Sequence, residues 1–420
     1  ARSFTMIEIG KQLPLPNLEK LNCAEIAIRS KGEEGFIAYF DFQEAYCLDS
    51  KKVADGLGKL TEQQSPSSLS FSGWLGFFGY EFLSANLGLT LQSSRDLEVP
   101  DGWFGRPQSI IHILPNQTKI ESTLPEREQQ IAHALEFSDL FDLNQVKFAT
   151  SSQKCNLSYP EYEKIFAGAR EAILDGESYQ IKISQRYEAK VKIEPILAFS
   201  KLSLANPAPE SFLLQTRKFS LVSCSPEAVI NRKGNYISTR PIGGTYERNE
   251  NKNDSSVIKR FLQDPKEVAE HNMLVDLERN DLSTVCIPGS VQLTRFREVE
   301  TYSHLHHLVS TIEGTLQENA GVNEILTAML PGGSITGCPK IRTMEWIDRL
   351  EPCFRGPYTG SFGIISDQGD LSLNLIIRSM LILEEYCYTQ AGGGIVVDST
   401  PQYEYNENKL KAQALLDLLS

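Results

Sequence analysis

Residues 264–281 have the sequence Asp-Pro-Lys-Glu-Val-Ala-Glu-His-Asn-Met-Leu-Val-Asp-Leu-Glu-Arg-Asn-Asp. Asp264 is a good helix N-cap, the proline after it suits a first turn, and the acid at 267 suits the third helical position. At helical spacing, one stripe of this segment consists of Glu267, Glu270, Leu274 and Leu277. Because an apolar stripe normally faces the core, the pattern predicts a helix with carboxylates on its inward side near its start.

Inward carboxylates of this kind have two explanations. An unpaired buried charge is costly, so such groups usually pair with a cation or bind a metal ion. The alternative is an ordinary acid near a helix N-terminus, where the helix dipole favours negative charge. The first helix alone does not choose between them.

A second segment near the end of the chain repeats the pattern. Thr400-Pro401 predicts another helix start, and Lys411 lies one turn beyond Glu407. The stripe of this helix consists of Glu407, Leu410, Ala414 and Leu418. Mg²⁺ takes one or two protein carboxylates together with water and substrate oxygens. We therefore predict a magnesium site with Glu270 and Glu407 as ligands and Glu267 behind them.

Three glycine-rich or cationic segments lie between the two helices. They are Pro-Gly-Gly-Ser-Ile-Thr-Gly-Cys-Pro-Lys at 331–340, Arg-Gly-Pro-Tyr at 355–358 and Ala-Gly-Gly-Gly at 391–394. Glycine lets backbone N–H groups approach an anion, and arginine can bind a carboxylate with two hydrogen bonds. Each segment alone could be a tight turn. Together with a metal ion they predict a site for a dianionic small molecule.

These motifs resemble component I of the chorismate-utilising synthases, which include anthranilate synthase, aminodeoxychorismate synthase and their isochorismate and salicylate relatives. The resemblance also rests on Thr-Arg-Pro-Ile-Gly-Gly-Thr at 239–245, Tyr-Ser-His-Leu-His-His-Leu-Val-Ser at 302–310 and the segment 404–412. The motifs occur in the family's order and cover residues 155–420 densely. Residues 1–150 match loosely, chiefly through Gly-Trp-Leu-Gly-Phe-Phe-Gly-Tyr-Glu at 73–81.

The resemblance implies the anthranilate synthase component I-like fold. This is an α/β (α+β) architecture of two intertwined subdomains, with large facing antiparallel sheets and outer helices. We expect an N-terminal domain at 1–150 and a chorismate-binding catalytic domain at 151–420, which would hold the active site. Locally, the patterns predict a charged helix at 125–138 and strands at 221–230 and 236–241.

Composition narrows the function further. The chain has 420 residues, a formal net charge of −13 and 41% apolar residues. That charge argues against nucleic acid or an anionic membrane surface as a partner. The sequence has no apolar run of about 18 residues and no signal-peptide core at its start. Its eight cysteines form no Cys-x-x-Cys pair. We therefore expect a cytoplasmic protein with reduced thiols.

The segment Tyr-Gln-Ile-Lys-Ile-Ser at 179–184 alternates as a strand, with Gln180, Lys182 and Ser184 on one face. By itself Gln180 would be an ordinary strand glutamine. In the family, water-using members have a water-activating lysine at this position, whereas ammonia-using members have glutamine. The resemblance therefore implies an aminating enzyme. Ammonia would come from a glutaminase (amidotransferase) subunit, because these residues contain no glutaminase nucleophile-elbow motif.

Two further catalytic residues follow from the resemblance. Glu227 matches the general acid that protonates the departing 4-hydroxyl of chorismate, a task that needs a raised pKa. Without the resemblance it would be a surface acid after a turn proline. His307 matches a histidine near the ring and its carboxylate. A zinc site made of His304, His306 and His307 is the alternative, but neighbouring strand residues point to opposite sides.

The resemblance also implies which residues bind chorismate. They are Arg240, Gly244, Thr245, Ser334, Tyr358, Arg378, Gly392, Gly393, Gly394 and Lys411. The cationic members of this set would form a local positive region on an acidic body, which suits an anionic substrate.

The position at which ammonia is added is the remaining question. Asn-Pro-Ala-Pro at 206–209, the segment 331–340 and Leu-Glu-Pro at 350–352 resemble aminodeoxychorismate synthase more than anthranilate synthase. Many aminodeoxychorismate synthases, however, have a lysine, proposed to attack ring C2, where this chain has Gly243. We expect 4-amino-4-deoxychorismate as product, with anthranilate synthase or a non-enzymatic aromatic-acid-binding homologue as alternatives. We also expect open room beside Gly243 for a small nucleophile.

Overall fold

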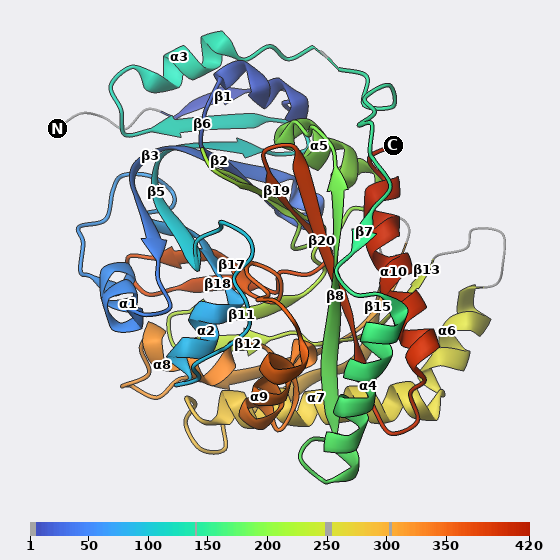
Figure 1. Ribbon diagram of the computed structural model, residues 1–420. Coiled ribbons are helices and arrows are strands. Elements are labelled where there is room, and N and C mark those ends of the chain that lie inside the picture. Colours follow the sequence, from blue (N-terminus) through green and yellow to red (C-terminus); the bar gives the residue numbers. More distant parts are fainter. Residues whose placement is uncertain (1–5, 139–140, 248–253, 302–304) are drawn as a thin grey trace.

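The computed structural model describes residues 6–138, 141–247, 254–301 and 305–420 (Figure 1). Its helices are α1 (Val53–Thr61), α2 (Tyr80–Asn86), α3 (Arg127–Ala134), α4 (Tyr159–Leu174), α5 (Pro195–Ala205), α6 (Asp254–Leu262), α7 (Pro265–Ser283), α8 (Val322–Met329), α9 (Lys340–Leu350) and α10 (Pro401–Asp417). Short 3₁₀ segments are η1 (Leu15–Leu21), η2 (Gly32–Glu34) and η3 (Gly333–Ile335).

The strands follow one another along the whole chain. They are β1 (Ile7–Ile9), β2 (Ile26–Ser30), β3 (Phe36–Leu48), β4 (Gly73–Phe78), β5 (Gly102–Ile113), β6 (Thr118–Ser122), β7 (Lys154–Cys155), β8 (Gln180–Lys190), β9 (Phe212–Gln215), β10 (Ser220–Ser223), β11 (Ala228–Lys233), β12 (Tyr236–Thr239), β13 (Ile242–Glu247), β14 (Gln292–Thr301), β15 (Leu305–Thr315), β16 (Gly337–Cys338), β17 (Ser361–Ser366), β18 (Leu371–Asn374), β19 (Ser379–Leu383) and β20 (Tyr386–Ile395).

These strands form one large, curled antiparallel sheet with two arms that meet at β5. The first arm has the order β1–β6–β5–β3–β2–β9–β10–β19–β20–β8. The second arm has the order β4–β17–β18–β11–β12–β15, and β13 and β14 also pair with β15. Strand β4 pairs with the beginning of β5 and so joins the arms. The predicted mixed α/β architecture with an extensive antiparallel sheet is confirmed.

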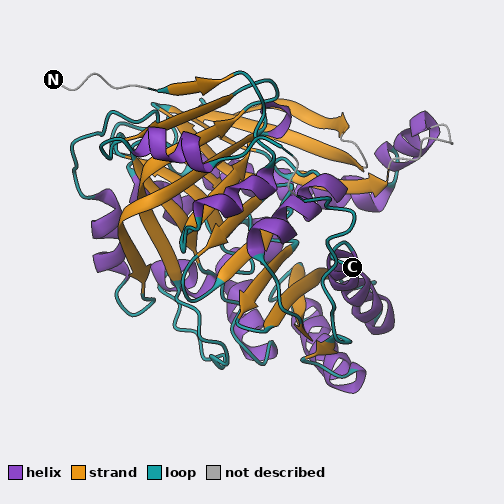
Figure 2. Ribbon diagram, turned by 90° about the horizontal axis from the view of Figure 1, so that it is seen from above, coloured by secondary structure: helices purple, strands orange, loops and turns teal. Residues whose placement is uncertain are grey.

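Helices lie mainly around the outside of the strands (Figure 2). Helix α10 packs on β20, β8 and α4, whereas α7 packs on β13, β15 and α8. Strands from the first 150 residues pair with later strands at two places, β2 with β9 and β4 with β17. The N-terminal segment is therefore built into the same sheet as the rest of the chain.

The start of α7 agrees with the sequence pattern. The Asp264 side chain caps the helix by accepting the backbone N–H groups of Lys266 and Glu267. The fully buried face lies one step round from the predicted stripe and consists of His271, Val275, Glu278 and Leu282. Leu274 and Leu277 are only half-buried. A helix turns 100° per residue, so a stripe one position away from the buried face points in a different direction. The predicted stripe of α7 therefore lines a cavity instead of packing in the core.

The predicted inward stripe of α10 is wrong. Leu410 is 64% exposed, and Ala414 is also exposed. The buried face consists of Asn408, Ala412, Leu415 and Leu416. Two other local predictions need smaller corrections. The helix expected at 125–138 covers only Arg127–Ala134, and the strand expected at 221–230 is divided into β10 and β11 around Pro226, which has no backbone N–H to donate.

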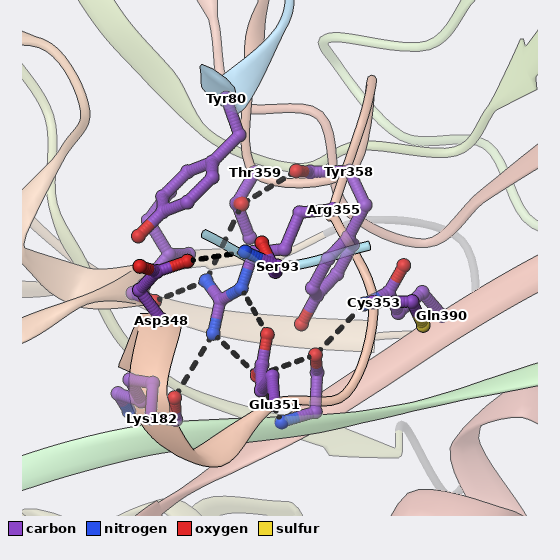
Figure 3. A network of polar contacts seen from close by, with 12 residues as sticks. Tyr80, Ser93, Lys182, Asp348, Glu351, Cys353, Arg355, Tyr358, Thr359 and Gln390 are labelled. Carbon is purple, nitrogen blue, oxygen red and sulfur yellow. Dashed lines mark hydrogen bonds and ion pairs between the residues drawn. The ribbon is translucent and has the colours of Figure 1, made fainter. Parts of the chain in front are cut away.

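A buried ion pair joins several of these segments (Figure 3). The Arg355 guanidinium donates from Nε and Nη2 to the two carboxylate oxygens of Glu351 at 2.8 and 2.9 Å. It also donates to the backbone carbonyl oxygens of Ile335 at 3.0 Å and Lys182 at 2.9 Å. The same carboxylate accepts the backbone N–H and the hydroxyl of Ser184. Strand β8, η3 and the loop after α9 are thus fixed to one another.

Glu81 of α2 joins the N-terminal segment to the same loop. Its carboxylate accepts the backbone N–H of Arg355 at 3.1 Å and that of Gly356 at 2.7 Å. Burial raises the pKa of Glu81 to about 7, although the two N–H donors act in the opposite direction. The segment 73–81, which resembled the family only loosely, therefore supports the loop that carries Arg355 and Tyr358.

We predict that Arg355→Lys lowers the free energy of unfolding by about 3 kcal/mol, because a lysine keeps the charge but cannot make the forked contacts. Urea unfolding at neutral pH measures this change. Arg342→Lys is the matched control, since the Arg342 side chain is 42% exposed and its ion pairs lie on the surface. A stability of the Arg355 variant equal to that of the control variant would contradict the role of the buried pair.

We also predict a pH dependence that originates at Glu81. The folded pKa of about 7 lies above the unfolded value of 4.5, so the folded state retains a proton that the unfolded state has lost. The contribution of Glu81 to stability therefore falls as pH rises from about 4.5 to 7, by up to roughly 3 kcal/mol. Glu81→Gln should gain stability relative to the wild type over this range in urea titrations. Glu33 is exposed, so the stability of Glu33→Gln should follow that of the wild type at every pH. If the stability of Glu81→Gln also follows that of the wild type, Glu81 is not the source of the pH dependence.

Candidate active site

A cavity of about 980 Å³ lies between α7, α10, β8 and β20, beside η3 and the turn between β10 and β11. Predicted site residues that line it are Gln180, Glu227, Glu267, Glu270, Ser334, Tyr358, Arg378, Gly392 and Lys411. These residues come from eight separate parts of the chain. The fold therefore gathers most of the residues that the motifs singled out around one space.

Gln180 is at the beginning of β8, is 5% exposed and faces α7. Its Nε2 donates to Oε1 of Glu270 at 3.3 Å. Lys182, two residues along the same strand face, places Nζ 3.8 Å from that oxygen. The expected alternation of β8 therefore brings an amide and an ammonium group to the same carboxylate, and Lys182 is a cavity residue that the motifs did not identify.

Glu227 is a buried acid held in a fixed orientation. It is 6% exposed, and its Oε1 accepts the backbone N–H of Ile242 at 3.0 Å. Its Oε2 accepts the hydroxyl of Ser334 at 3.1 Å. Burial raises the pKa of Glu227, while these two hydrogen bonds and the charges of Lys182 and Arg378 act in the opposite direction. A carboxyl with a raised pKa inside a cavity can donate a proton.

The three glycines at 392–394 make room for side chains of other segments. A Cβ at Gly392 would lie 3.0 Å from the Tyr358 hydroxyl, and one at Gly393 would lie 2.6 Å from Oε2 of Glu404. A Cβ at Gly394 would lie 2.1 Å from Nε2 of Gln180 and 3.0 Å from Nζ of Lys182. A side chain at any of these three positions would therefore force neighbouring groups of the site to shift, whether or not the glycine N–H groups bind an anion.

The carboxylates of α7 and α10 can be tested as magnesium ligands. Glu267 and Glu270 line the cavity, but Glu407 does not. Burial and then the charge of Glu270 raise the pKa of Glu267. Burial also raises the pKa of Glu404, with Glu407 adding to the rise. Among the described residues, no three His, Cys, Asp or Glu side chains are close enough to form a metal cage. A small number of carboxylates that repel one another is a suitable set of ligands for Mg²⁺. This ion keeps several of its waters and also binds substrate oxygens.

Other predicted residues lie away from the cavity wall. Arg240 forms an ion pair with Glu300. His307 is 2% exposed and belongs to β15, where it pairs with Glu300 of β14 and Thr245 of β13. Gly244 pairs with Leu308 of the same strand. His306 contacts Thr301 and Asp254, whereas His304, the third member of the zinc alternative, lies outside the described residues.

The expectation of open room beside Gly243 is wrong. A Cβ at this position would lie only 2.3 Å from Nδ1 of His271, so the imidazole already fills the space. His271 lines the cavity and is 2% exposed. Burial, with a smaller effect of Arg297, lowers the pKa of His271 to about 4. The motif quoted from α7 contains this histidine, but nothing in the sequence shows which strand it contacts.

Glu278 was also missed by the sequence patterns. It is 4% exposed, and burial raises its pKa to about 8. Nearby, Lys340 forms an ion pair with Asp281 at 3.0 Å. This contact uses Lys340, the cation at the end of the segment 331–340. A signal was present in the sequence, since Glu278 lies on the same helical stripe as His271 and Val275.

Comparison with known proteins agrees with the geometry. A family model described as chorismate binding enzyme matches residues 24–417. The aminodeoxychorismate synthase component 1 of Bacillus subtilis is 35% identical over 357 residues, covering 82% of this chain and 76% of the relative. The anthranilate synthase component 1 of Haloarcula marismortui is 45% identical over 249 residues, but the match covers 59% of this chain and only 51% of the relative.

Among solved structures, anthranilate synthase component I from Streptococcus pneumoniae is similar, with a TM-score of 0.79 and 27% identity. That match covers 94% of this chain and 92% of the other. In the described part of the chain, no helix has the length and apolar character to span a membrane. The resemblance inferred from the motifs is confirmed: this chain belongs to the family of chorismate-binding enzymes.

Proposed function

We propose that this chain converts chorismate to 4-amino-4-deoxychorismate, the precursor of 4-aminobenzoate in folate synthesis. Ammonia would come from a glutamine amidotransferase partner, and the enzyme would act in the cytoplasm. The observation that carries the proposal is Gln180, whose amide reaches into the cavity at the position where water-using relatives have lysine. A neutral amide can orient ammonia but cannot serve as a base for water.

Lys182 does not restore a water-activating base at this point. Its Nζ forms an ion pair with Glu270, and an ammonium group has no lone pair with which to accept a proton. Lys182, Arg378 and Lys411 instead give the cavity three cationic side chains. These charges suit the two carboxylates of chorismate. Tyr358 and Gly392 also line the cavity.

Glu227 is the proposed general acid. The 4-hydroxyl of chorismate is a poor leaving group unless it receives a proton as the bond to the ring breaks. The raised pKa of Glu227 favours the protonated form that this step needs. Ser334 and the backbone of Ile242 hold the carboxyl in place, so the proton is delivered from a fixed position.

Glu270 and Glu407 are the proposed magnesium ligands, with Glu267 behind them. When bound, the ion would supply positive charge that helps to hold the ring carboxylate of chorismate. The protein's own part is to bring α7 and α10 to the cavity. Glu404 is a further candidate from α10, since it reaches Gly393 and its pKa is raised.

The sequences of three motifs support addition of ammonia at C4, whereas Gly243 supports addition at C2. The segments at 206–209, 331–340 and 350–352 resemble aminodeoxychorismate synthases, one of which covers 82% of this chain. On the other side, Gly243 offers no nucleophile for a first attack at C2. If ammonia itself added at C2, loss of pyruvate would give anthranilate. Anthranilate synthesis is therefore the second candidate.

We predict that the wild-type chain, given chorismate, Mg²⁺ and ammonium, forms a product that an added aminodeoxychorismate lyase converts to 4-aminobenzoate. Mass spectrometry and fluorescence identify the products. Omission of the lyase is the control, because 4-amino-4-deoxychorismate persists without it. Anthranilate that appears in the absence of the lyase would replace the first candidate with the second, and no aminated product at all would contradict both.

We further predict that Glu270→Gln weakens magnesium binding by at least roughly tenfold, because a neutral amide is a poorer ligand for a hard cation. Titration calorimetry with Mg²⁺ in the presence of chorismate measures the change, and turnover should fall with it. Asp276→Asn on the exposed face of α7 is the matched control. Unchanged magnesium binding by the Glu270 variant would remove Glu270 from the site.

A further inference from the structure

The ring of His271 takes the space of a side chain at position 243. Gly243 lies where the register between β13 and β15 shifts, between the pairs Ile242–Val309 and Gly244–Leu308. Such a β-bulge redirects the local chain and is common beside active sites. A Cβ at Gly243 would lie 2.3 Å from Nδ1 and 2.6 Å from Cγ of His271. Only one of these two positions can therefore carry a bulky side chain.

Ser310 holds the imidazole in this place. The Ser310 Oγ lies 2.6 Å from Nε2 of His271 and accepts the backbone N–H of Arg297 at 3.0 Å. If the Ser310 hydroxyl donates a hydrogen bond to Nε2, the ring proton is on Nδ1. In that tautomer only the Nδ1–H group has no partner among the described residues. The other tautomer would leave both the hydroxyl proton and the Nδ1 lone pair unpaired in a buried location, which costs more. The ring is therefore anchored, with its protonated Nδ1 edge against Gly243.

We propose that His271 determines the route of amination by keeping position 243 free of any side chain. The inference rests on the proposed function. An amine at position 243 could attack ring C2 while the 4-hydroxyl leaves as water with the proton of Glu227. Ammonia would then add at C4 and expel that amine. With the imidazole in place, no such amine can be present on β13, so ammonia is added at C4 without a covalent bond between position 243 and the substrate.

The steric part is tested by a double-mutant cycle of Gly243→Ala and His271→Ala, measured by melting temperature and kcat/KM. Gly243→Ala alone should lower the melting temperature and reduce kcat/KM by roughly tenfold, but it should cost little when His271→Ala has removed the ring. Gly10→Ala is the matched control, since no atom lies within 4 Å of its added Cβ and Gly10 is not among the residues that line the cavity. Equal effects of Gly243→Ala in both backgrounds would overturn the proposal.

The route itself is tested with Gly243→Lys, alone and combined with His271→Ala. Each protein is mixed with chorismate without ammonium, and its intact mass is measured. The double variant should gain the mass of chorismate minus one water on the peptide that contains position 243, whereas the single variant should not. An adduct formed while His271 is intact, or a folded double variant that binds chorismate without forming one, would overturn the proposal.

These readouts are independent of the product made by the wild type. If the wild type releases anthranilate, the proposed function fails, but the cycle of melting temperatures still measures the coupling between Gly243 and His271. If the wild type makes 4-amino-4-deoxychorismate and the two positions behave independently, the proposed function stands and the inference on His271 fails. The two failures therefore give different results.

Discussion

The buried ion pair between Arg355 and Glu351 is the interaction on which the site most depends. Removing two charges from water is expensive, and the cost is offset only when both groups are fully hydrogen-bonded. Here the guanidinium bonds both carboxylate oxygens and two backbone carbonyls, and Tyr80 and Tyr358 lie 4.9 and 5.6 Å from it as aromatic neighbours. The pair consequently fixes the relative positions of β8, η3 and the loop at 355–359. The cavity residues on these segments are fixed with them.

The charge within the cavity differs from that of the whole chain. The net charge of −13 would repel a dianion at long range. Inside the cavity, Lys182, Arg378 and Lys411 face Glu227, Glu267 and Glu270. This arrangement suits a substrate with two carboxylates and one polar leaving group, because separate cations and a separate neutral acid are available. A divalent cation would bring the acidic side of the cavity closer to neutrality.

Small residues at this site make room for side chains from distant segments. Gly392, Gly393 and Gly394 leave space for Tyr358, Glu404 and the pair Gln180 and Lys182, while Gly243 leaves space for His271. Close packing means that a bulky group can be supplied by either of two neighbouring elements but not by both. A motif can therefore have a glycine because the side chain of another segment fills the space. This reason is different from a need for backbone flexibility.

The sequence by itself determined the parts that depend on neighbours along the chain. The Asp264 cap, the alternation of β8 and the order of the family motifs are local patterns. The cap and the alternation predicted their elements, and nine of the predicted site residues line the cavity. Only the tertiary structure decided which face of α10 is buried, that Arg240 pairs with Glu300, and that Lys182 and His271 line the cavity. These facts depend on contacts between segments separated by many residues, and helical or strand periodicity places a side chain on a face without specifying what that face meets.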